Sequence, residues 1–322
     1  MVPTLKAAIE DLKAGRLENG RQKLEKHGVI KELSDAAELR KGAVEQHLAG
    51  LRVGKSSLLI CPRHEEARKV AAILRLQLKT EGAIGAADYA VTVLRCMDLG
   101  SESYRGPVHY APGRVVGFHT RTSGGFKPGE RWTVRETNCE TVTLERNGKV
   151  RQFKPSANGK WDVLAPSTMQ VSIGDQIRVT AGFREGKNVF KNNDLAKLRE
   201  VSDTELVLHD GRRMRRDGAR NDQGVCITSH ASQCRTVDQV VVLADGSDAK
   251  GWYVSLSRAR EAMHVYTRNK AALRQSVMHP TPGARSVQFS KLWSDPTELT
   301  LSRRMFLAGD RRLTWLSALA RE

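Results

Sequence analysis

The chain of 322 residues is long enough to bury one large hydrophobic core or two modest ones. It carries 53 Lys and Arg residues against 36 Asp and Glu residues, and the net charge of +17 favours a polyanionic partner, most simply nucleic acid, over a merely solvated basic surface. Charged residues interrupt every hydrophobic run and no signal peptide is found, so we expect a cytoplasmic protein without a membrane segment. The five cysteines form no CxxC pair, which favours reduced packing residues over disulfides or a metal site.

The first part of the chain is charged and has the spacing of amphipathic helices, which predicts a helical linker over residues 1–54. Asp35, with Glu38 three residues later, marks a helix start. The linker ends at Gly54, within the segment Gly54-Lys55-Ser56. This is not a phosphate-binding loop, because Ala49 stands where glycine is needed and a helical run precedes it where a strand is required. We therefore predict an ordinary turn, and a chain without Walker A and Walker B motifs.

Residues 55–112 begin a parallel sheet, since a buried-strand pattern over 57–61 is followed by a helical pattern over 64–79. Residues 113–220 then change to short alternating runs separated by turn signals such as Asn147-Gly148. The strands expected there are 114–118, 131–135, 141–145, 177–180 and 205–208. This pattern predicts an antiparallel β insertion of one or two small barrels.

Residues 221–278 resume the sheet, with buried-strand signals at 225–228 and 240–243. Between these signals lies the polar cluster Thr228-Ser229-His230-Ala231-Ser232-Gln233, where a strand end would present it to a ligand. In the next segment, a helix-compatible run with Arg258 and Arg260 leads into an apolar strand pattern over 263–266. Residues 279–322 are expected to form a helical tail.

The two polar segments resemble motifs V and VI of superfamily 1 DNA helicases, in the RecD-like branch found in the helicase half of TraI/TrwC (MobF) conjugative relaxases, where a UvrD-like helicase C-terminal domain carries them. Motif V, roughly T-x-H-x-x-Q-G-x-T, is matched by Thr228, His230, Gln233 and Thr236, while Cys234 replaces the glycine. Motif VI, roughly Y-V-A-L-S-R-A-R, is matched over 253–260, with Ser255 in place of the alanine. Residues 58–62 resemble motif IV, and 174–180 resemble the G-D-x-I-R-x-T segment before motif V.

This resemblance, which covers residues 55–273, implies an α/β fold: a RecA-like parallel sheet interrupted by an antiparallel β insertion of small barrels, with helical N- and C-terminal flanks. It implies the second motor domain of an ATP-dependent DNA helicase or translocase from a bacterial conjugative relaxase, with single-stranded DNA as its partner. The Walker A and B domain is missing. ATP and Mg²⁺ would therefore bind only when a first RecA-like motor domain completes the site in cis or in trans.

The resemblance also implies roles for the site residues. Arg258 would be the arginine finger that reaches the γ-phosphate, and Gln233 and Arg260 would also contact the nucleotide. The backbone of the single strand would be bonded, without reading of its sequence, by Thr228, Ser229 and His230. The alternatives are structural: a surface arginine for Arg258, an ion pair for Arg260 and a packed histidine for His230.

An arginine cluster in the insertion follows a predicted hairpin turn and consists of Arg212, Arg213, Arg215 and Arg216. Basic residues that interleave with aromatic ones are typical of grooves that bind single strands. Small barrels, however, also need aromatic cores. We expect phosphate contacts from the arginine cluster and core packing from most of the aromatic residues, Phe126, Trp132, Phe153 and Trp161.

A second function stays open, that of an ATP-independent module that binds single-stranded DNA. The intact motif VI with Arg258 favours the motor domain, because a pure binding module has no use for an arginine finger. The missing Walker motifs favour binding alone for this chain in isolation, as does Cys234, whose side chain stands where glycine allows close backbone approach.

Overall fold

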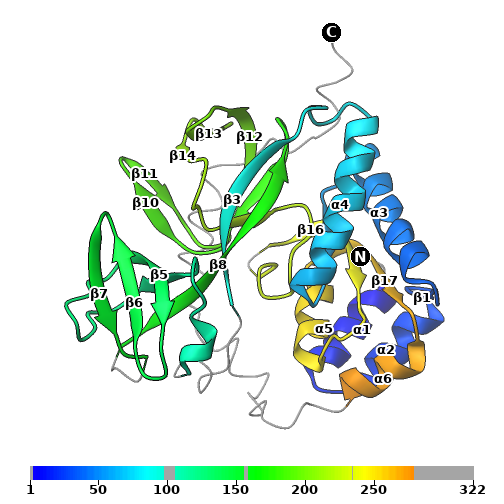
Figure 1. Cartoon of the computed structure of the whole chain (residues 1–322). Helices are drawn as coiled ribbons and strands as arrows, with labels where there is room; N and C mark the ends of the chain where they lie inside the picture. Colours follow the sequence, from blue (N-terminus) through cyan, green and yellow to red (C-terminus); the bar gives the residue numbers. More distant parts are fainter. Residues whose placement is uncertain (1–2, 98–105, 156–158, 234, 279–322) are drawn as a thin grey trace. The chain divides into compact units, whose positions relative to one another are not determined.

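The computed structural model describes residues 3–97, 106–155, 159–233 and 235–278. The chain divides into two compact units (Figure 1). The first, the sheet unit, comprises Met1–Thr80 and Val225–Glu322, and the second, the insertion unit, comprises Glu81–Gly224. Each unit is described by itself.

The sheet unit is built on a parallel sheet of four strands in the order β1-β17-β16-β2. Their bounds are β1 Ile30–Glu32, β2 Ser57–Ile60, β16 Val237–Leu243 and β17 Ala259–Thr267. The predicted strand at 225–228 is reduced to a single parallel bridge between Ile60 and Ile227, at the edge beyond β2. The helices are α1 Pro3–Lys13, α2 Leu17–Lys26, α3 Ala36–Arg52, α4 His64–Thr80, α5 Ala249–Leu256 and α6 Lys270–Met278.

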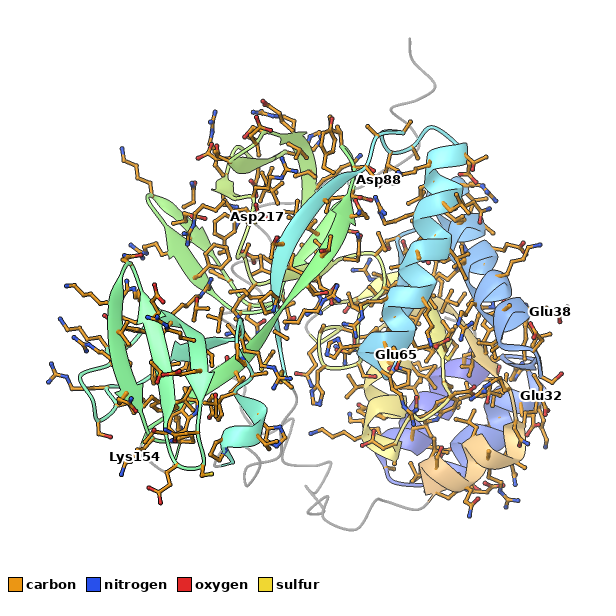
Figure 2. The ribbon with its side chains drawn as sticks, viewed as in Figure 1. Glu32, Glu38, Glu65, Asp88, Lys154 and Asp217 are labelled. Carbon is orange, nitrogen blue, oxygen red and sulfur yellow. The ribbon has the colours of Figure 1, made fainter. Side chains whose placement is uncertain are left out.

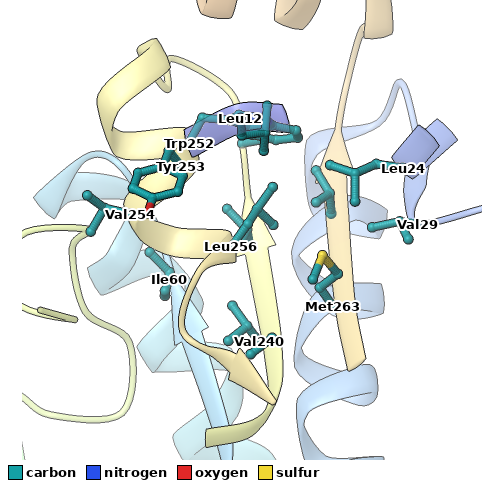
Figure 3. Close-up of a cluster of buried hydrophobic side chains, with 14 of the residues drawn as sticks. Leu12, Leu24, Val29, Ile60, Val240, Trp252, Tyr253, Val254, Leu256 and Met263 are labelled. Carbon is teal, nitrogen blue, oxygen red and sulfur yellow. The ribbon is translucent and has the colours of Figure 1, made fainter. Parts of the chain in front are cut away.

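Helices cover both faces of this sheet, because successive side chains of a buried strand point to opposite sides. One face presents Ile60, Val240 and Met263 to a core that includes Leu12 of α1 and Trp252 of α5, all of them buried (Figure 3). The opposite face is turned toward α3, where only the missing side chain of Gly42 leaves room for the Tyr266 ring: an added Cβ would lie 3.2 Å from it. The sheet is thus buried on both sides.

The predicted start of α3 and the predicted turn after it are both confirmed. The side chain of Asp35 accepts hydrogen bonds from the backbone N–H groups of Ala37 and Glu38, so Asp35 is the N-cap. α3 ends at Arg52, Gly54 has a φ of +75°, and β2 follows. The order of helix, turn and strand is the reverse of a phosphate-binding loop.

The insertion unit is antiparallel. Its six-stranded sheet has the order β3-β8-β4-β5-β6-β7, its five-stranded sheet the order β14-β13-β12-β9-β15, and β10 and β11 form a hairpin. The bounds are β3 Tyr89–Cys96, β4 Val115–Phe118, β5 Arg131–Thr137, β6 Val142–Arg146, β7 Lys149–Phe153, β8 Trp161–Val171, β9 Gln176–Val179, β10 Phe183–Glu185, β11 Asn188–Phe190, β12 Leu195–Val201, β13 Glu205–Leu208, β14 Arg213–Arg215 and β15 Asn221–Gln223. A 3-10 helix, η2, spans Pro107–His109.

Two separate hydrophobic cores stabilise the insertion unit. The first is aromatic, with the Phe118 and Phe126 rings stacked 4.4 Å apart and Trp132 buried against Phe126. The prediction of core packing for most of the aromatic residues is confirmed. The second core is mostly aliphatic and lies on β3, β8 and the five-stranded sheet. The predicted turn at Asn147-Gly148 joins β6 to β7, with positive φ at both residues.

The predicted fold class, an α/β chain with a parallel sheet interrupted by an antiparallel β insertion, is confirmed for the described residues. The boundary of the insertion unit differs from the expected start at residue 113. β3 pairs with β8 along its whole length, so the compact unit already begins at Glu81. The predicted helical tail at 279–322 lies outside the described residues.

Candidate functional site

A cavity of about 360 Å³ lies at the carboxyl edge of the parallel sheet. Its walls are the segments that follow β2, the Ile227 bridge and β16, together with the first turns of α5. In open parallel sheets, ligands bind outside the carboxyl ends of the strands. The lining residues include four of the predicted site residues: Thr228, Ser229, His230 and Gln233.

The loop that carries these four residues is held in a compact turn by its own hydrogen bonds. The backbone N–H of Ser232 donates to the carbonyl of Thr228 at 3.0 Å, and the Ser232 hydroxyl donates to the carbonyl of Ser229 at 2.6 Å. Ala231 and Ser232 are buried beneath the turn, whereas His230 and Gln233 are exposed. His230 is therefore not the packed core histidine of the alternative interpretation.

The start of α5 forms the opposite wall of this cavity. Asp248 is the N-cap of the helix, and its Oδ1 accepts the backbone N–H of Gly251 at 2.7 Å. A Cβ on Gly251 would lie 2.8 Å from that Oδ1 and 3.4 Å from the Ser229 hydroxyl. A side chain at this position would therefore crowd the capping carboxylate of Asp248, whereas its distance to the loop would be that of an ordinary contact.

A hydrogen bond between two serine side chains joins the loop to the helix. The Oγ atoms of Ser229 and Ser255 lie 2.9 Å apart, and Ser255 is buried. Ser255 donates its one hydroxyl proton to the carbonyl of Gly251 at 2.7 Å. By elimination, Ser229 is the donor of the bond between the two serines. Its proton is thus directed into the protein, and a phosphate contact donated by Ser229 would have to break this bond.

The predicted nucleotide-contacting arginines lie at the other edge of the sheet. Arg258 is in the turn between α5 and β17, where its Nε donates to the carbonyl of Val254 and its Nη2 to the Ser257 hydroxyl. The carbonyl of Arg258 accepts the backbone N–H of Val237 at 3.0 Å, at the start of β16. Arg258 therefore sits at the amino edge, half-buried and fixed to the end of α5.

Arg260 is a strand residue, not a helix residue as the sequence suggested. It is the second residue of β17, is exposed, and forms an ion pair with Asp238 at 3.5 Å. Asp238 also accepts hydrogen bonds from the N–H and the hydroxyl of Ser56. Nearby, Lys55 pairs with Glu261 at 3.0 Å. The structural interpretation of Arg260 as an ion-pair partner thus has a definite geometry.

Gln233 is placed by the structure with the predicted DNA-contacting residues instead of with Arg258 and Arg260. Its side chain lines the carboxyl-edge cavity. β16 begins at Val237, at the amino edge of the sheet. The predicted nucleotide set is therefore divided between the two edges of the sheet.

Every arginine of the predicted cluster in the insertion unit has a carboxylate partner. Figure 2 shows the side chains of the two units as sticks. The partners are Asp194 and Asp210 for Arg212, Glu205 for Arg213, Glu185 for Arg215 and Asp203 for Arg216. Arg212 and Arg216 also donate to main-chain carbonyls. The side chains of Arg213 and Arg215 are the more exposed, at 59% and 75%.

Sequence reasoning missed three residues at the carboxyl-edge cavity. Lys250 and Asp248 line it, and Arg63 packs against Gly246, where an added Cβ would lie 3.0 Å from the guanidinium. Their positions in the sequence could have indicated this site, because they follow the carboxyl ends of strands. Arg63 lies three residues after β2, and Asp248 and Lys250 follow β16 at the start of a helix.

Two further groups with shifted acidity lie inside the sheet unit. Burial lowers the pKa of His47 to about 4, and its Nδ1 lies 2.8 Å from the hydroxyl of Ser57, the first residue of β2. Cys61 and Cys226 are buried with their sulfur atoms 3.2 Å apart, and the hydrogen bond between them, followed by burial, raises the pKa of Cys61. Within the described residues, no group of three or more His, Cys, Asp and Glu side chains could hold a metal ion.

Among the helices that the structure describes, none combines the length and the apolar character needed to cross a lipid bilayer.

No protein-family model matches the chain, and no curated protein matches it. Solved structures similar to it include Pif1 helicase from Bacteroides in complex with ADP-AlF3 and ssDNA, at 12% identity and a TM-score of 0.31, over 96% of this chain and 55% of that one. Pif1 helicase from Candida albicans is 12% identical with a TM-score of 0.34, over 83% of this chain and 57% of that one. The chain thus spans about half the length of these structures.

Proposed function

We propose that the chain is the second motor domain of a superfamily 1 DNA helicase or translocase, which binds single-stranded DNA at the carboxyl edge of its sheet and presents Arg258 at the amino edge. The observation that supports this most is α5. Its first turns line the cavity that contains the motif V residues, and its end holds the motif VI arginine. One short, buried helix thus connects the two groups that a DNA-dependent ATPase has to couple.

The carboxyl-edge cavity has the chemistry of a phosphate-backbone site without base recognition. Its polar groups include the Thr228 hydroxyl, the His230 ring and the Gln233 amide, with the Lys250 ammonium adding positive charge. Asp248 is the one carboxylate among the lining residues, and its Oδ1 is engaged by Gly251. In this proposal Thr228, His230 and Lys250 contact DNA, while Ser229 positions the loop.

Arg258 acts in this proposal on a nucleotide that a first RecA-like domain holds. A planar, permanently charged guanidinium suits the charge that develops on a transferring phosphoryl group. In this proposal the first domain supplies the phosphate-binding loop and the acid that holds Mg²⁺. Gly54-Lys55-Ser56 supports this, because it is a turn before a strand and Lys55 pairs with Glu261. ATP and Mg²⁺ would therefore act only in the completed motor, with Gln233 and Arg260 as further candidate contacts.

The origin in a bacterial conjugative relaxase rests on the motif V and VI matches and on the G-D-x-I-R-x-T segment. In the structure this segment contains β9. Asp175, just before the strand, is fully buried, and its Oδ2 accepts the N–H of Ser172. The segment therefore belongs to the insertion core, and its contribution to the proposal is as a sequence signature of the cytoplasmic relaxase helicases.

The alternative is an ATP-independent module that binds single-stranded DNA. The turn at Gly54-Lys55-Ser56, which is not a phosphate-binding loop, and Cys234 favour it for the chain in isolation. The two functions separate in one experiment, in which the chain is compared alone and joined to a matching first motor domain. Both predict binding of oligothymidylate that weakens steeply with salt.

We expect the chain alone to show no DNA-stimulated ATP hydrolysis, and the joined protein to show it. Hydrolysis by the chain alone that is abolished by Lys55→Ala would contradict the proposal. Failure of the joined, folded protein to hydrolyse ATP, together with intact DNA binding, would instead establish the binding module.

A further inference from the structure

A cavity of about 950 Å³ lies entirely within the insertion unit. One wall is formed by β4, β5 and β6, and the other by β10 and the segment 215–220. Asp217, which is labelled in Figure 2, belongs to that segment, and its Oδ1 accepts the N–H of Thr92. The two walls are therefore fixed to each other through β3.

Arg131 lines this cavity as a cation without an ionic partner. It is the first residue of β5 and is half-buried, and its Nη1 donates to the carbonyl of Gly218 at 2.8 Å. It forms no ion pair with any residue that the structure describes. Burial lowers the pKa of Arg131, and the charges of Arg220 and Arg215 lower it further, against a smaller opposing effect of the Glu185 carboxylate. These like charges all face the same cavity.

Arg220 is the more deeply buried neighbour, with a side chain that is 12% exposed. Its Nη1 pairs with Asp162 at 2.7 Å, but Asp162 is shared with His119, whose Nε2 lies 2.9 Å away. The Nε of Arg220 is buried and has no hydrogen-bond partner among the described residues. A buried donor without a partner is costly, since it has lost its water and gained nothing in return.

The local charges do not balance. Six arginines line the cavity, and four of them have a carboxylate partner: Arg135 with Glu145, Arg146 with Glu130, Arg215 with Glu185 and Arg220 with Asp162. Arg131 and the exposed Arg184 form no ion pair with a described residue, and Asp217 accepts the N–H of Thr92. The lining differs from the arginine cluster that the sequence singled out, in which each member is paired. Arg131 is therefore the half-buried arginine of the lining that has no carboxylate partner, and Arg220 adds a buried Nε without a hydrogen-bond partner.

We propose that this cavity is an oxyanion site, in which Arg131 and Arg220 bind a phosphate group. Planar guanidinium forks match the oxygens of a phosphate, and such charge-assisted bonds are the strong ones. The apolar part of the wall includes Phe183, whose ring stacks on Phe190 at 4.6 Å, so the cavity takes a ligand larger than the phosphate alone. The source is either a phosphodiester of a nucleic acid strand or a free phosphate compound. The site does not depend on the proposed motor function.

The test uses the full chain, with inorganic phosphate as the probe and chloride at equal ionic strength as the reference, in titration calorimetry. Arg131→Gln removes the charge and keeps amide donors. Arg199→Gln is the matched control, because Arg199 is exposed on β12 and lies outside the cavity lining. We expect saturable phosphate binding that Arg131→Gln weakens by about tenfold or more and Arg199→Gln leaves unchanged.

A purely structural role for Arg131 gives a different result. It would lower the thermal midpoint of Arg131→Gln in chloride, whereas an unpaired cation among like charges predicts a midpoint no lower than that of the parent. If Arg131→Gln does not fold, Arg131→Lys keeps the charge, loses the planar fork and is expected to bind phosphate with intermediate affinity. Equal binding of phosphate and chloride, or equal losses in Arg131→Gln and Arg199→Gln, would overturn the proposal.

Labelled oligothymidylate identifies the source of the phosphate. If inorganic phosphate displaces the oligothymidylate and Arg131→Gln weakens oligothymidylate binding, the ligand is a phosphodiester strand. If its affinity is the same in Arg131→Gln while phosphate binding is lost, the ligand is a free phosphate compound. Both results support the oxyanion site.

Discussion

The two edges of the parallel sheet differ in chemistry. The carboxyl edge has a cavity lined by hydroxyl, imidazole and amide groups of a short loop. One lysine also lines it, as does one carboxylate, which caps the N-terminus of α5. The amino edge is ionic, with Arg260 paired to Asp238 and Lys55 to Glu261 around the turn that holds Arg258. Neutral donors suit a ligand that has to slide, whereas fixed charges suit a ligand whose charge changes during reaction.

α5 connects the two edges and sets the distance between the loop at one edge and Arg258 at the other. Its eight residues span about 12 Å. The Ser229–Ser255 bond fixes the loop to the helix, and Arg258 bonds back to Val254 in its last turn. A shift of the loop would therefore be passed to Arg258 through a buried, rigid element. We expect a replacement at one edge to change mainly the function of that edge, although α5 joins the two.

The largest effect is expected from Arg258→Ala in the chain joined to a first motor domain. DNA-stimulated hydrolysis should fall by about a thousandfold, because the charge that stabilises the transition state is lost. The affinity for single-stranded DNA should stay within about twofold, because the proposed DNA site lies at the other edge. Turnover assays and fluorescence anisotropy measure the two quantities.

Arg268→Ala is the control for that experiment, since Arg268 is an exposed arginine just after β17 that pairs with Asp245. Near-normal hydrolysis in Arg258→Ala would refute the finger assignment. Equal losses of hydrolysis and DNA affinity would show that Arg258 only holds the end of α5 in place.

The pH dependence of stability tests the packing beneath the amino edge. His47 has a pKa of about 4 in the folded chain because it is buried, against about 6.5 when unfolded. The unfolded chain therefore takes up the proton first, and the free energy of unfolding falls as the pH is lowered from about 6.5 to 4, by about 3 kcal/mol for this group. Urea unfolding at several pH values measures the slope.

His47→Gln should flatten that slope, whereas replacement of the exposed His27 should not. The loss at low pH should appear first where His47 meets Ser57, that is, in hydrogen exchange of α3 and the start of β2. An unchanged slope in His47→Gln would mean that other groups control acid unfolding.

The four arginines of the predicted cluster should fall into two pairs, one that affects DNA binding and one that affects stability. Arg213→Ala with Arg215→Ala, both exposed, should reduce the salt dependence of DNA binding by about one unit of the logarithmic slope. Arg212→Ala with Arg216→Ala should instead cost about 2 kcal/mol of stability, because these side chains bond main-chain carbonyls. An unchanged salt slope in all four replacements would show a solvated surface only.

The smallest effect is expected from Ser255→Ala, which restores the residue of the related motif. Loss of the Ser229–Ser255 bond should weaken single-strand binding by about threefold, or about 0.7 kcal/mol. Ser229→Ala combined with Ser255→Ala should be no worse than either change alone, because both remove the same bond. Ser276→Ala is the control, since its hydroxyl bonds only within α6. Additive losses would show that Ser229 contacts DNA directly.

Much of the fold and part of the site could be predicted from local pattern. Asp35 as a helix cap, the turn at Asn147-Gly148 and the buried run in β16 are set by side chains close in sequence. The polar residues after the Ile227 bridge were correctly placed at a strand end. The reduction of the strand at 225–228 to one bridge was not predictable, because pairing depends on a distant partner.

The sequence by itself determined the alternation of apolar positions, the turns and the motif residues, because each depends on neighbours a few positions away. Only the tertiary structure decided that β3 joins β8, that the conspicuous arginines are neutralised by Glu185, Asp194 and Glu205, and that Arg131 is not. It also decided that Ser229 donates its proton to Ser255. Charge and hydrogen-bond partners come from residues far apart in the chain, so composition and spacing cannot reveal which cations remain available to a ligand.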